Sequence, residues 1–423
     1  MLYEQWCKIA REQQDVLALR DLTSQRRWTF GELHAAGEAH HGSDGGIVYP
    51  QSNSPEFILT LLNAWRTGKT VCPLEPDQSP PLVPLPPRNY VHLKSTSSTT
   101  GAPRLVAFTP EQIAADAENI VATMGLRPDW PNLGVISLAH SYGFSNLVLP
   151  LLLHGIPLMV VPSALPEAVR RAAEGESAIT LPAVPALWRA WHEAGAIPPN
   201  VRLAISAGAP LPATLEQAVF TVSGLKIHNF YGSTECGGIA YDRTDLPRTD
   251  DACVGAPMRN VNVSLNEDGC LIVHGRAVGG TYWPQPADML GAGVFQTSDL
   301  AELNDGVVYL RGRASDQINV AGRKVSPAAI EKALMEHPAL RACLVFGAPG
   351  CNGDRADLIV ACVVAASPVS REALRQFLLE RVPAWQMPRD WWFVDSLATN
   401  RLGKISRAEW RWRYLAEKVK AES

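Results

Sequence analysis

Short apolar runs alternate with amphipathic segments along residues 47–230, and this alternation constrains the fold more than any other feature of the sequence. At the first repeat, an apolar run is followed by Ser54, Pro55 and Glu56, which are typical of a helix start, and Gly68 ends the helical pattern. The expected strands are residues 47–49, 70–74, 158–161, 178–181, 201–206 and 226–230, and the later helices are 166–173, 185–194 and 214–220. Strands and helices that alternate in this way predict an α/β domain with a largely parallel sheet.

The pattern changes after about residue 240, where short strands separated by Gly and Asp turns indicate a small antiparallel β subdomain. The strands expected there are residues 261–265, 271–274 and 307–310. From residue 316 onward, helices at 327–336 and 371–379 and strands at 343–346 and 358–365 indicate a compact α+β unit. We therefore predict a large N-terminal domain over residues 1–312 and a small C-terminal domain over residues 313–423. The proline-rich residues 75–88 predict a stiff extended connector.

Charge, hydropathy and cysteine spacing exclude several classes of protein. The chain carries 38 Lys plus Arg against 42 Asp plus Glu, a net charge of −4, so there is no basic excess for binding nucleic acid. The longest apolar stretch, residues 147–161, is interrupted by prolines and is too short to cross a membrane as one helix. Residues 1–14 mix charges and lack the apolar run of a secretory signal, which predicts a cytoplasmic protein. The eight cysteines form no C-x-x-C pair, so neither a zinc ribbon nor a dithiol redox site is indicated.

A run of hydroxyl residues follows one of the apolar segments: residues 95–104 read STSSTTGAPR. Ser and Thr side chains compete with the backbone for hydrogen bonds, so such a run makes a poor helix or strand. A loop of hydroxyl and amide donors is able to wrap phosphate oxygens, whereas a serine-rich linker is the alternative reading of this segment alone. No G-x-x-x-x-G-K-[ST] phosphate-binding loop is present.

A second segment, NFYGSTE at residues 229–235, comes at the end of the apolar run 226–230. Open α/β sheets bind ligands at the carboxyl ends of their strands, where this segment is expected. Tyr231 could stack on a base, Thr234 could donate to a phosphate, and Glu235 could hold Mg²⁺ as a hard oxygen ligand. Considered alone, the heptapeptide is also consistent with an ordinary loop.

Two further segments carry candidate polar groups. Residues 297–299 read TSD, and residues 312–323 read GRASDQINVAGR. The carboxylate of Asp299 could accept hydrogen bonds from both hydroxyls of a ribose. Residues 400–407 read NRLGKISR, where Lys404 follows a glycine. A single Gly-Lys pair by itself indicates only a solvated polar turn.

The order and spacing of these four segments resemble the adenylate-forming superfamily, which comprises acyl- and aryl-CoA ligases, luciferases and the adenylation domains of peptide synthetases. The resemblance spans nearly the whole chain and includes WTFGEL at 28–33, HSYG at 140–143, ISAGAPL at 205–211 and VGAP at 254–257. It implies that ATP and Mg²⁺ are used to form an acyl- or aryl-adenylate with release of pyrophosphate. It also implies transfer of the acyl group to a thiol, either of CoA or of the phosphopantetheine of an acyl carrier protein.

The resemblance further implies roles for individual residues. Glu235 would ligate Mg²⁺, Thr234 would touch the α-phosphate, and Asp299 and Arg313 would hold the ribose. The β and γ phosphates would be gripped by Thr96, Ser97, Ser98, Thr99, Thr100 and Gly101, and adenine would be framed by Gly208, Ala209, Asn229 and Tyr231.

The last implied roles concern the chemistry and a moving domain. Lys404 would bridge the carboxylate and the α-phosphate, and His140 joins Lys404, Thr234 and Glu235 among the catalytic candidates. Rotation of the mobile C-terminal domain would then withdraw Lys404 and bring Gly322 to the pantetheine tunnel.

The chain departs from the family pattern at Ser98, where glycine is usual, at Arg104, where lysine is usual, and at the hinge residue Ser315, which is typically Asp or Lys. None of these changes removes a phosphate-facing or metal-facing group, so we expect activity to survive. Two alternatives stay open at this point: a catalytically weak relative that binds a nucleotide or an acyl group, and an adenylating enzyme with a non-thiol acceptor.

The acid is expected to be a small aryl acid or a medium acyl chain. In the peptide-synthetase domains that the chain resembles, an Asp near this segment pairs with the amine of an α-amino acid; residues 140–146 contain no acidic residue, so the resemblance disfavours an α-amino acid. The candidate pocket walls are mostly apolar or small. They are His140, Tyr142, Phe144, Ala183, Val184, Ala207, Gly232, Cys236, Gly237 and Gly238.

Overall fold

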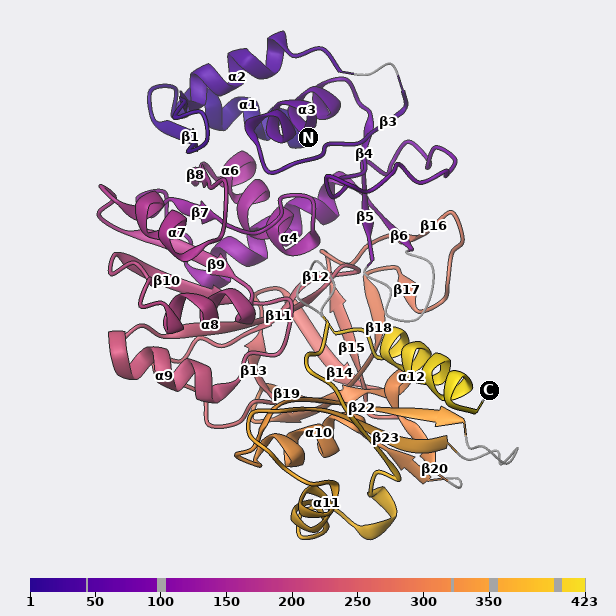
Figure 1. Cartoon of the computed structure of the whole chain (residues 1–423). Coiled ribbons are helices and arrows are strands. Elements are labelled where there is room, and N and C mark those ends of the chain that lie inside the picture. The colour runs from indigo at the N-terminus through magenta and orange to yellow at the C-terminus, as the bar shows by residue number, and fades with distance from the viewer. Residues whose placement is uncertain (43–44, 97–103, 321–322, 350–356, 399–404, 423) are drawn as a thin grey trace.

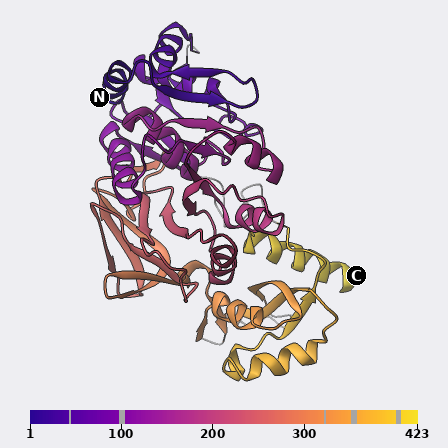
Figure 2. The same cartoon turned by 90° about the vertical axis from the view of Figure 1, so that its left-hand side faces the viewer.

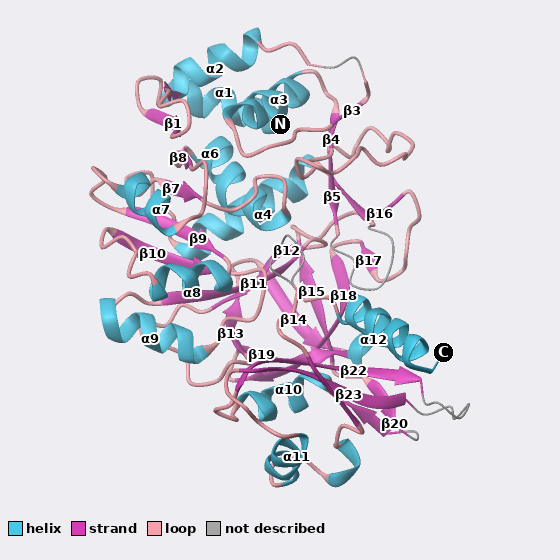
Figure 3. Ribbon diagram, in the orientation of Figure 1, coloured by secondary structure: helices cyan, strands magenta, loops and turns pink. Residues whose placement is uncertain are grey.

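The structure is a computed structural model of the chain, and it describes residues 1–42, 45–96, 104–320, 323–349, 357–398 and 405–422 (Figure 1). The N-terminal elements lie at one end of the molecule and the C-terminal elements at the other, as two perpendicular views agree (Figures 1 and 2). Helices flank the strands in the N-terminal part, whereas strands dominate the middle of the chain (Figure 3).

Parallel strands form the first part of the largest sheet. The neighbours are β11, β10, β9, β7, β8 and β1, each adjacent pair is parallel, and β2 pairs antiparallel with β1 at the edge. These strands are β1 (Leu17–Asp21), β2 (Arg27–Thr29), β7 (Asn132–Gly134), β8 (Leu158–Val160), β9 (Ile179–Ala183), β10 (Val201–Ser206) and β11 (Ile227–Ser233). The segments between them carry α4 (Pro110–Met124), α5 (Ser141–Gly143), the π-helix η1 (Phe144–Val148), α6 (Leu149–His154), α7 (Pro166–Ala173), α8 (Pro185–Glu193) and α9 (Ala213–Ser223). Parallel neighbours need crossover connections, and these helices supply them.

The same sheet continues from β11 into antiparallel strands, in the order β12, β13, β19, β18, β15 and β14, while β17 pairs with β18. These strands are β12 (Gly237–Tyr241), β13 (Cys253–Pro257), β14 (Val261–Leu265), β15 (Cys270–Gly275), β17 (Leu290–Gly291), β18 (Val294–Asn304) and β19 (Val307–Arg313). The predicted antiparallel region is therefore present and is joined to the parallel strands through β11.

A second sheet has the order β16-β6-β5-β4-β3. Its strands are β3 (Ile47–Val48), β4 (Thr70–Val71), β5 (His92–Ser95), β6 (Leu105–Phe108) and β16 (Thr281–Trp283). Helix α3 (Pro55–Arg66) packs on β3 and β4, and it also contacts α1 (Leu2–Glu12) and α2 (Phe30–Ala39). β5 and β6 form an antiparallel hairpin with Ser95 opposite Leu105. The hydroxyl-rich segment therefore joins the paired ends of this hairpin.

The C-terminal elements bury apolar clusters of their own, one around Ile330, Val345, Val363 and Leu374. The elements are η2 (Ala314–Asp316), β20 (Ile318–Val320), β21 (Arg323–Val325), α10 (Pro327–Met335), β22 (Leu340–Pro349), β23 (Asp357–Ala365), α11 (Arg371–Leu379), η3 (Ala384–Gln386), β24 (Asp390–Phe393) and α12 (Arg407–Glu422). The exact domain limits, 1–312 and 313–423, stay a prediction.

The predicted α/β class with a large parallel sheet and an α+β C-terminal unit is confirmed. Strand 226–230 was predicted too short, because β11 continues to Ser233 where it pairs with β12. Strand 70–74 was predicted too long, since β4 ends at Val71, before Pro73, which has no N–H to donate. Within the described residues, no helix is long and apolar enough to span a membrane.

Candidate active site

The residues predicted to frame adenine come together at the ends of two neighbouring strands. Ser206, at the end of β10, lies opposite Asn229 of β11, and Gly208 follows two residues later. Gly208 has φ +86°, a backbone conformation that favours glycine, while Ala209 after it is half-buried. The buried Asn229 donates from Nδ2 to the carbonyl of Cys253 at 3.1 Å. These positions form an edge of backbone groups and small side chains.

Tyr231, Asp299 and Arg313 form a hydrogen-bonded chain beside that edge. The Tyr231 hydroxyl donates to Asp299 Oδ2 at 2.6 Å, and Arg313 Nε donates to Asp299 Oδ1 at 2.9 Å. Burial and the Asp299 carboxylate raise the pKa of Tyr231 well above its ordinary value, so the phenol stays a neutral donor. Burial lowers the pKa of Arg313, but Asp299 more than offsets this and raises it overall. Each Asp299 oxygen keeps lone-pair capacity for a further donor such as a hydroxyl.

Glu235 is held by a tyrosine that the sequence did not single out. The Tyr282 hydroxyl donates to Glu235 Oε1 at 3.1 Å, and the Glu235 backbone is fixed by bonds to the Ser233 hydroxyl and the Gly279 amide. Burial, followed by Glu235, raises the pKa of Tyr282. Thr234 stands half-buried beside Glu235 at the end of β11. The arrangement fixes one carboxylate in position through one of its oxygens, and among the described residues no hydrogen bond to its second oxygen is found.

Thr96 and Arg104, at the base of the hydroxyl-rich loop, lie next to the Tyr282–Glu235 pair. Thr96 donates from its amide to the Arg104 carbonyl at 2.8 Å, and the Arg104 amide donates to Thr96 Oγ1 at 3.1 Å. The Arg104 guanidinium lies 5.2 Å from the centre of the Tyr282 ring, and the hydroxyl of the same tyrosine donates to Glu235. Three distant segments of the sequence therefore meet around Tyr282. The other predicted loop residues, Ser97, Ser98, Thr99, Thr100 and Gly101, lie outside the described residues.

His140 caps the short helix α5. Its Nδ1 accepts from the Tyr142 amide at 3.3 Å, and its carbonyl accepts from the Phe144 amide. The π-helix η1 follows directly. Single π-helical turns are frequent at functional sites, which is consistent with the expected acid pocket here.

Lys404 and Gly322 lie outside the described residues, so their roles stay predictions. Arg407, three residues after Lys404, is held by described groups: Nη1 donates to Asp316 Oδ2 at 2.8 Å and Nη2 to Glu331 Oε2 at 2.6 Å. Asp316 belongs to η2, next to the predicted hinge residue Ser315, and Arg313 is bonded to Asp299. The residues on either side of Ala314–Ser315 are therefore anchored to opposite parts of the chain.

Two buried ionic networks were not expected from the sequence. The first consists of Lys94, Asp116 and Ser145, and Asp116 accepts from the Gly238 amide. The second consists of Lys226, Glu216, Asp242 and Arg248, and Arg248 shares the Cys253 carbonyl with Asn229. The sequence signal for the first network is Lys94, a charged residue next to the apolar run that precedes the hydroxyl-rich loop. Nothing local marks the second, because its members are spread over more than thirty residues.

Glu235 suits Mg²⁺, which is commonly held in proteins by one or two carboxylates together with substrate phosphates. Among the described residues no group of three metal-ligating side chains is found, so an all-protein metal cage is not indicated. The described cysteines are free.

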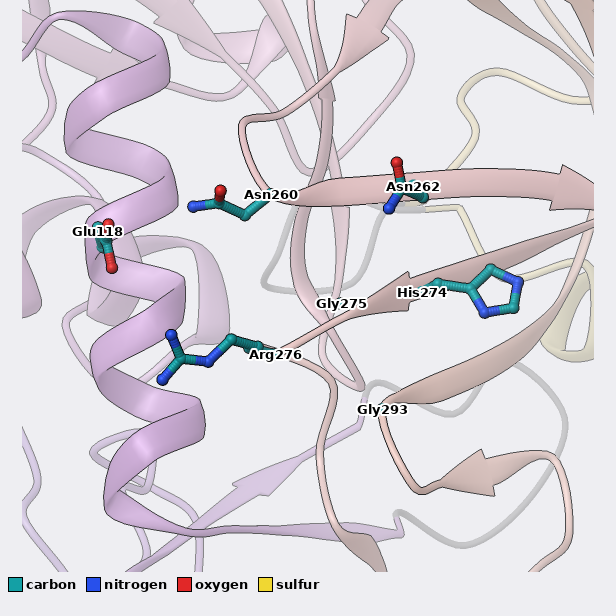
Figure 4. Close-up of a pocket in the computed structure, with 7 residues that line it drawn as sticks. All are labelled: Glu118, Asn260, Asn262, His274, Gly275, Arg276 and Gly293. Atoms are coloured by element: carbon teal, nitrogen blue, oxygen red, sulfur yellow. The ribbon is translucent and has the colours of Figure 1, made fainter.

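A pocket of about 490 Å³ lies elsewhere, between α4 and the β14–β15 pair (Figure 4). It is lined by Glu118, Asn260, Asn262, His274 and Arg276 with two glycines. None of the predicted site residues lines this pocket, so it is separate from the cluster around Glu235.

Comparison with known proteins places the chain in a family. Residues 77–283 match the family described as AMP-binding enzyme, and residues 329–404 match the AMP-binding enzyme C-terminal domain. The chain is 28% identical over 360 residues to a feruloyl-CoA synthase of Amycolatopsis sp, covering 80% of this chain and 72% of that protein. It is 26% identical over 334 residues to a 2-succinylbenzoate–CoA ligase of Bacillus cereus, covering 75% and 68%.

Solved structures share the fold over nearly the whole chain. ATP-bound MatB from Rhodopseudomonas palustris gives a TM-score of 0.85 at 18% identity, covering 98% of this chain and 99% of that one. The o-succinylbenzoate CoA synthetase of Bacillus subtilis, in complex with its acyl-adenylate intermediate, gives 0.79 at 20% identity, covering 96% and 97%.

Proposed function

Because the chain belongs to the AMP-binding enzyme family, we propose that it is an ATP-dependent acid–thiol ligase that joins a carboxylic acid to CoA through an acyl-adenylate. One observation carries the proposal: the segment 229–235, the Asp299–Arg313 pair and the base of the hydroxyl-rich loop are linked by contacts through Tyr231 and Tyr282. The names of the two curated relatives, both acid–CoA ligating enzymes, support the same reaction class.

In the first step, a carboxylate oxygen of the acid attacks the α-phosphorus of ATP. A new O–P bond forms, the bond from that phosphorus to the bridging oxygen breaks, and pyrophosphate leaves with the electron pair. Two anions must approach each other, so positioned cations and hydrogen-bond donors lower the barrier. Asp299 and Arg313 would orient the ribose, Thr234 and the hydroxyl-rich loop would orient the phosphates, and Lys404 would lie between the two anions. Mg²⁺ held at Glu235 would neutralise phosphate charge.

In the second step, the sulfur of the thiol attacks the acyl carbonyl, a C–S bond forms, and AMP leaves while the thiol proton passes to solvent. The change between steps would be a rotation of residues 313–423 relative to residues 1–312. The anchoring of Arg313 to Asp299 and of Asp316 to Arg407 supports a pivot at Ala314–Ser315, because those two residues lie between the anchors.

The experiment is ATP–pyrophosphate exchange with a panel of aryl and alkyl acids. Exchange that depends on an added acid is expected, and its absence with every acid would contradict the proposal and favour a relative that binds without turnover. Mass spectrometry with CoA and with a phosphopantetheinylated carrier protein then identifies the acceptor, and an adenylate that reacts with neither thiol would indicate a non-thiol acceptor. Use of a carrier protein and a cytoplasmic location stay predictions.

A further inference from the structure

A buried charged cluster lies against the expected acid pocket. Lys94 on β5 and Asp116 on α4 are 4% and 2% exposed, and Lys94 Nζ is 3.4 Å from Asp116 Oδ2. Lys94 also donates to Ser145 Oγ at 3.2 Å, and Ser145 in turn donates to Asp116 Oδ2 at 2.6 Å. An ion pair this deep needs hydrogen bonds to offset the loss of hydration, and Ser145 supplies two of them.

The cluster lies beside three of the residues predicted to wall the acid pocket, Gly237, Gly238 and Phe144. The Gly238 amide donates to Asp116 Oδ1 at 3.2 Å, and a Cβ placed on Gly237 would stand 2.0 Å from the same oxygen. Lys94 Nζ lies 5.7 Å from the centre of the Phe144 ring. Burial raises the pKa of the Cys236 thiol, and the charges of Asp116 and Lys94 act on it in opposite directions. The two glycines leave the carboxylate uncovered by any side chain of their own.

The hydrogen-bonding capacity of the cluster is incomplete. An ammonium group has three N–H donors, and the described residues offer Lys94 two acceptors, Asp116 and Ser145; aromatic faces of Phe108 and Phe144 lie on its other sides. His92, on the same face of β5 and 4.4 Å from the Phe144 ring centre, is 1% exposed, and both its ring nitrogens lack a partner among the described residues. Buried polar groups are normally paired, so such a group next to a pocket points to a missing polar partner.

We infer that Lys94, Asp116 and Ser145 form the polar floor of the acid pocket and select an acid that carries a hydroxyl at the end remote from the reacting carboxylate. The charge within the cluster is already balanced, so an added carboxylate or amine would bring an uncompensated buried charge. A hydroxyl is neutral, accepts from the third N–H of Lys94 and donates to Asp116. The inference rests on the proposed ligase activity, because it names the class of acid that this activity uses.

The experiment measures kcat/KM for acid-dependent pyrophosphate exchange with pairs of acids of equal shape: 4-hydroxybenzoate with 4-methylbenzoate, and 4-hydroxycinnamate with 4-methylcinnamate. We expect a preference for the hydroxy acid of about tenfold to 100-fold, the range for one buried hydrogen bond to a charged group. In Lys94→Met/Asp116→Asn, which removes both charges at similar volume, the ratio should fall to near one. Lys226→Met, which alters the other buried lysine, should keep the parental ratio.

The outcomes separate this inference from the proposed function. Acid-dependent exchange without a hydroxy preference in any pair, or a preference that survives in the double variant, would overturn the inference and leave the ligase activity standing. If no acid supports exchange, the proposed function fails, and binding of the same paired acids, followed by the shift they cause in the thermal unfolding midpoint, still decides whether Lys94 selects a hydroxyl. A thermal unfolding scan of each variant without ligand shows whether it is folded.

Discussion

A buried lysine lies near each expected side of the candidate active site, Lys226 near the nucleotide side and Lys94 near the acid side. The two lysines have different surroundings. Lys226 donates to Glu216 and to Asp242 Oδ2 at 2.6 Å, and Arg248 Nε donates to Glu216 Oε2 at 2.8 Å. The remaining donors of Arg248 go to backbone carbonyls, including that of Cys253 at 2.7 Å. Lys94, among the described residues, has one carboxylate, one hydroxyl and two aromatic rings around it.

This difference distinguishes a scaffold from a recognition site. In the Lys226 network two cations face two carboxylates, and the Cys253 carbonyl that accepts from Arg248 also accepts from Asn229, so the network braces the edge predicted to frame adenine. In the Lys94 network the charges also balance, but its two acceptors are one carboxylate and one hydroxyl, and the neighbouring His92 has no partner for either ring nitrogen among the described residues. A network closed by carboxylates stabilises one structure, whereas a cluster beside unpaired buried polar atoms retains capacity for a ligand.

The largest expected effect tests whether the Lys226 network is a scaffold. Lys226→Met leaves two buried carboxylates with Arg248 as their remaining cation, and breaking a buried ion pair costs about 3–5 kcal/mol. Urea unfolding should therefore show a loss of that size, while the order of preference among acids is unchanged. The exposed lysine variant Lys324→Met serves as control, and a Lys226 variant as stable as the parent would contradict the scaffold role.

Next in size is the loss of Lys404, which we predict to bridge the reacting carboxylate and the α-phosphate and which should therefore act alike on every acid. Lys404→Ala should lower adenylation by about 10² to 10³, by analogy with removal of one donor from an oxyanion hole. Formation of the thioester from supplied acyl-adenylate should be spared, because Lys404 would have moved away before that step. Equal loss of both half-reactions, or a loss that depends on the acid, would argue against this division of labour.

On the acid side, His92 gives a smaller effect that depends on pH. Burial and the nearby Lys94 hold the pKa of His92 well below its ordinary value, so the folded protein keeps it neutral while the unfolded chain binds a proton below about pH 6.5. Stability is therefore lost as pH falls, by about 1.4 kcal/mol per pH unit, or about 2 kcal/mol at pH 5.

His92→Phe keeps a ring against Phe144 and removes this loss. The decline in unfolding free energy from pH 8 to pH 5, measured by urea unfolding, should be about 2 kcal/mol smaller in the variant than in the parent. The value at pH 8 separates the change in packing from the change in protonation. Parallel pH profiles for the two proteins would contradict a buried neutral imidazole.

The smallest expected effect returns to the nucleotide side. Tyr282→Phe removes the hydroxyl that holds Glu235 but keeps the ring beneath Arg104, so the Mg²⁺ concentration for half-maximal exchange should rise about tenfold. Direct titration of MgATP binding should weaken in parallel, independently of turnover. Tyr309, which also lies beneath an arginine, offers a matched control as Tyr309→Phe. An unchanged Mg²⁺ dependence would show that Tyr282 only packs.

The agreement between sequence and structure depends on how local the deciding interactions are. The helices 166–173 and 371–379 and the strand 201–206 were placed at their observed limits, because prolines, a capping serine and periodicity act within a few residues. The end of β11 was wrong, since it is decided by pairing with β12. No element was predicted over α1 or α12, although both form helices.

In the candidate site, too, residues identified by local motifs were predicted, whereas residues defined by distant partners were not. Asp299 and Arg313 were assigned together to one ligand group, and the structure joins them through facing positions of β18 and β19. Tyr282, Lys94 and Asp116 were missed, because each acquires its meaning from a partner on another element.

By itself the sequence determined the α/β class and the main elements, since these follow from periodicity, capping and turn residues, and its resemblance to a known family indicated the segments expected to carry phosphate, metal and ribose chemistry. Only the tertiary structure decided which of those segments meet, that Tyr282 links Glu235 to the loop base, and that a buried Lys94–Asp116 cluster lies beside residues predicted to wall the acid pocket. The physical reason is that burial and ion pairing depend on groups brought together from far along the chain, which no local pattern specifies.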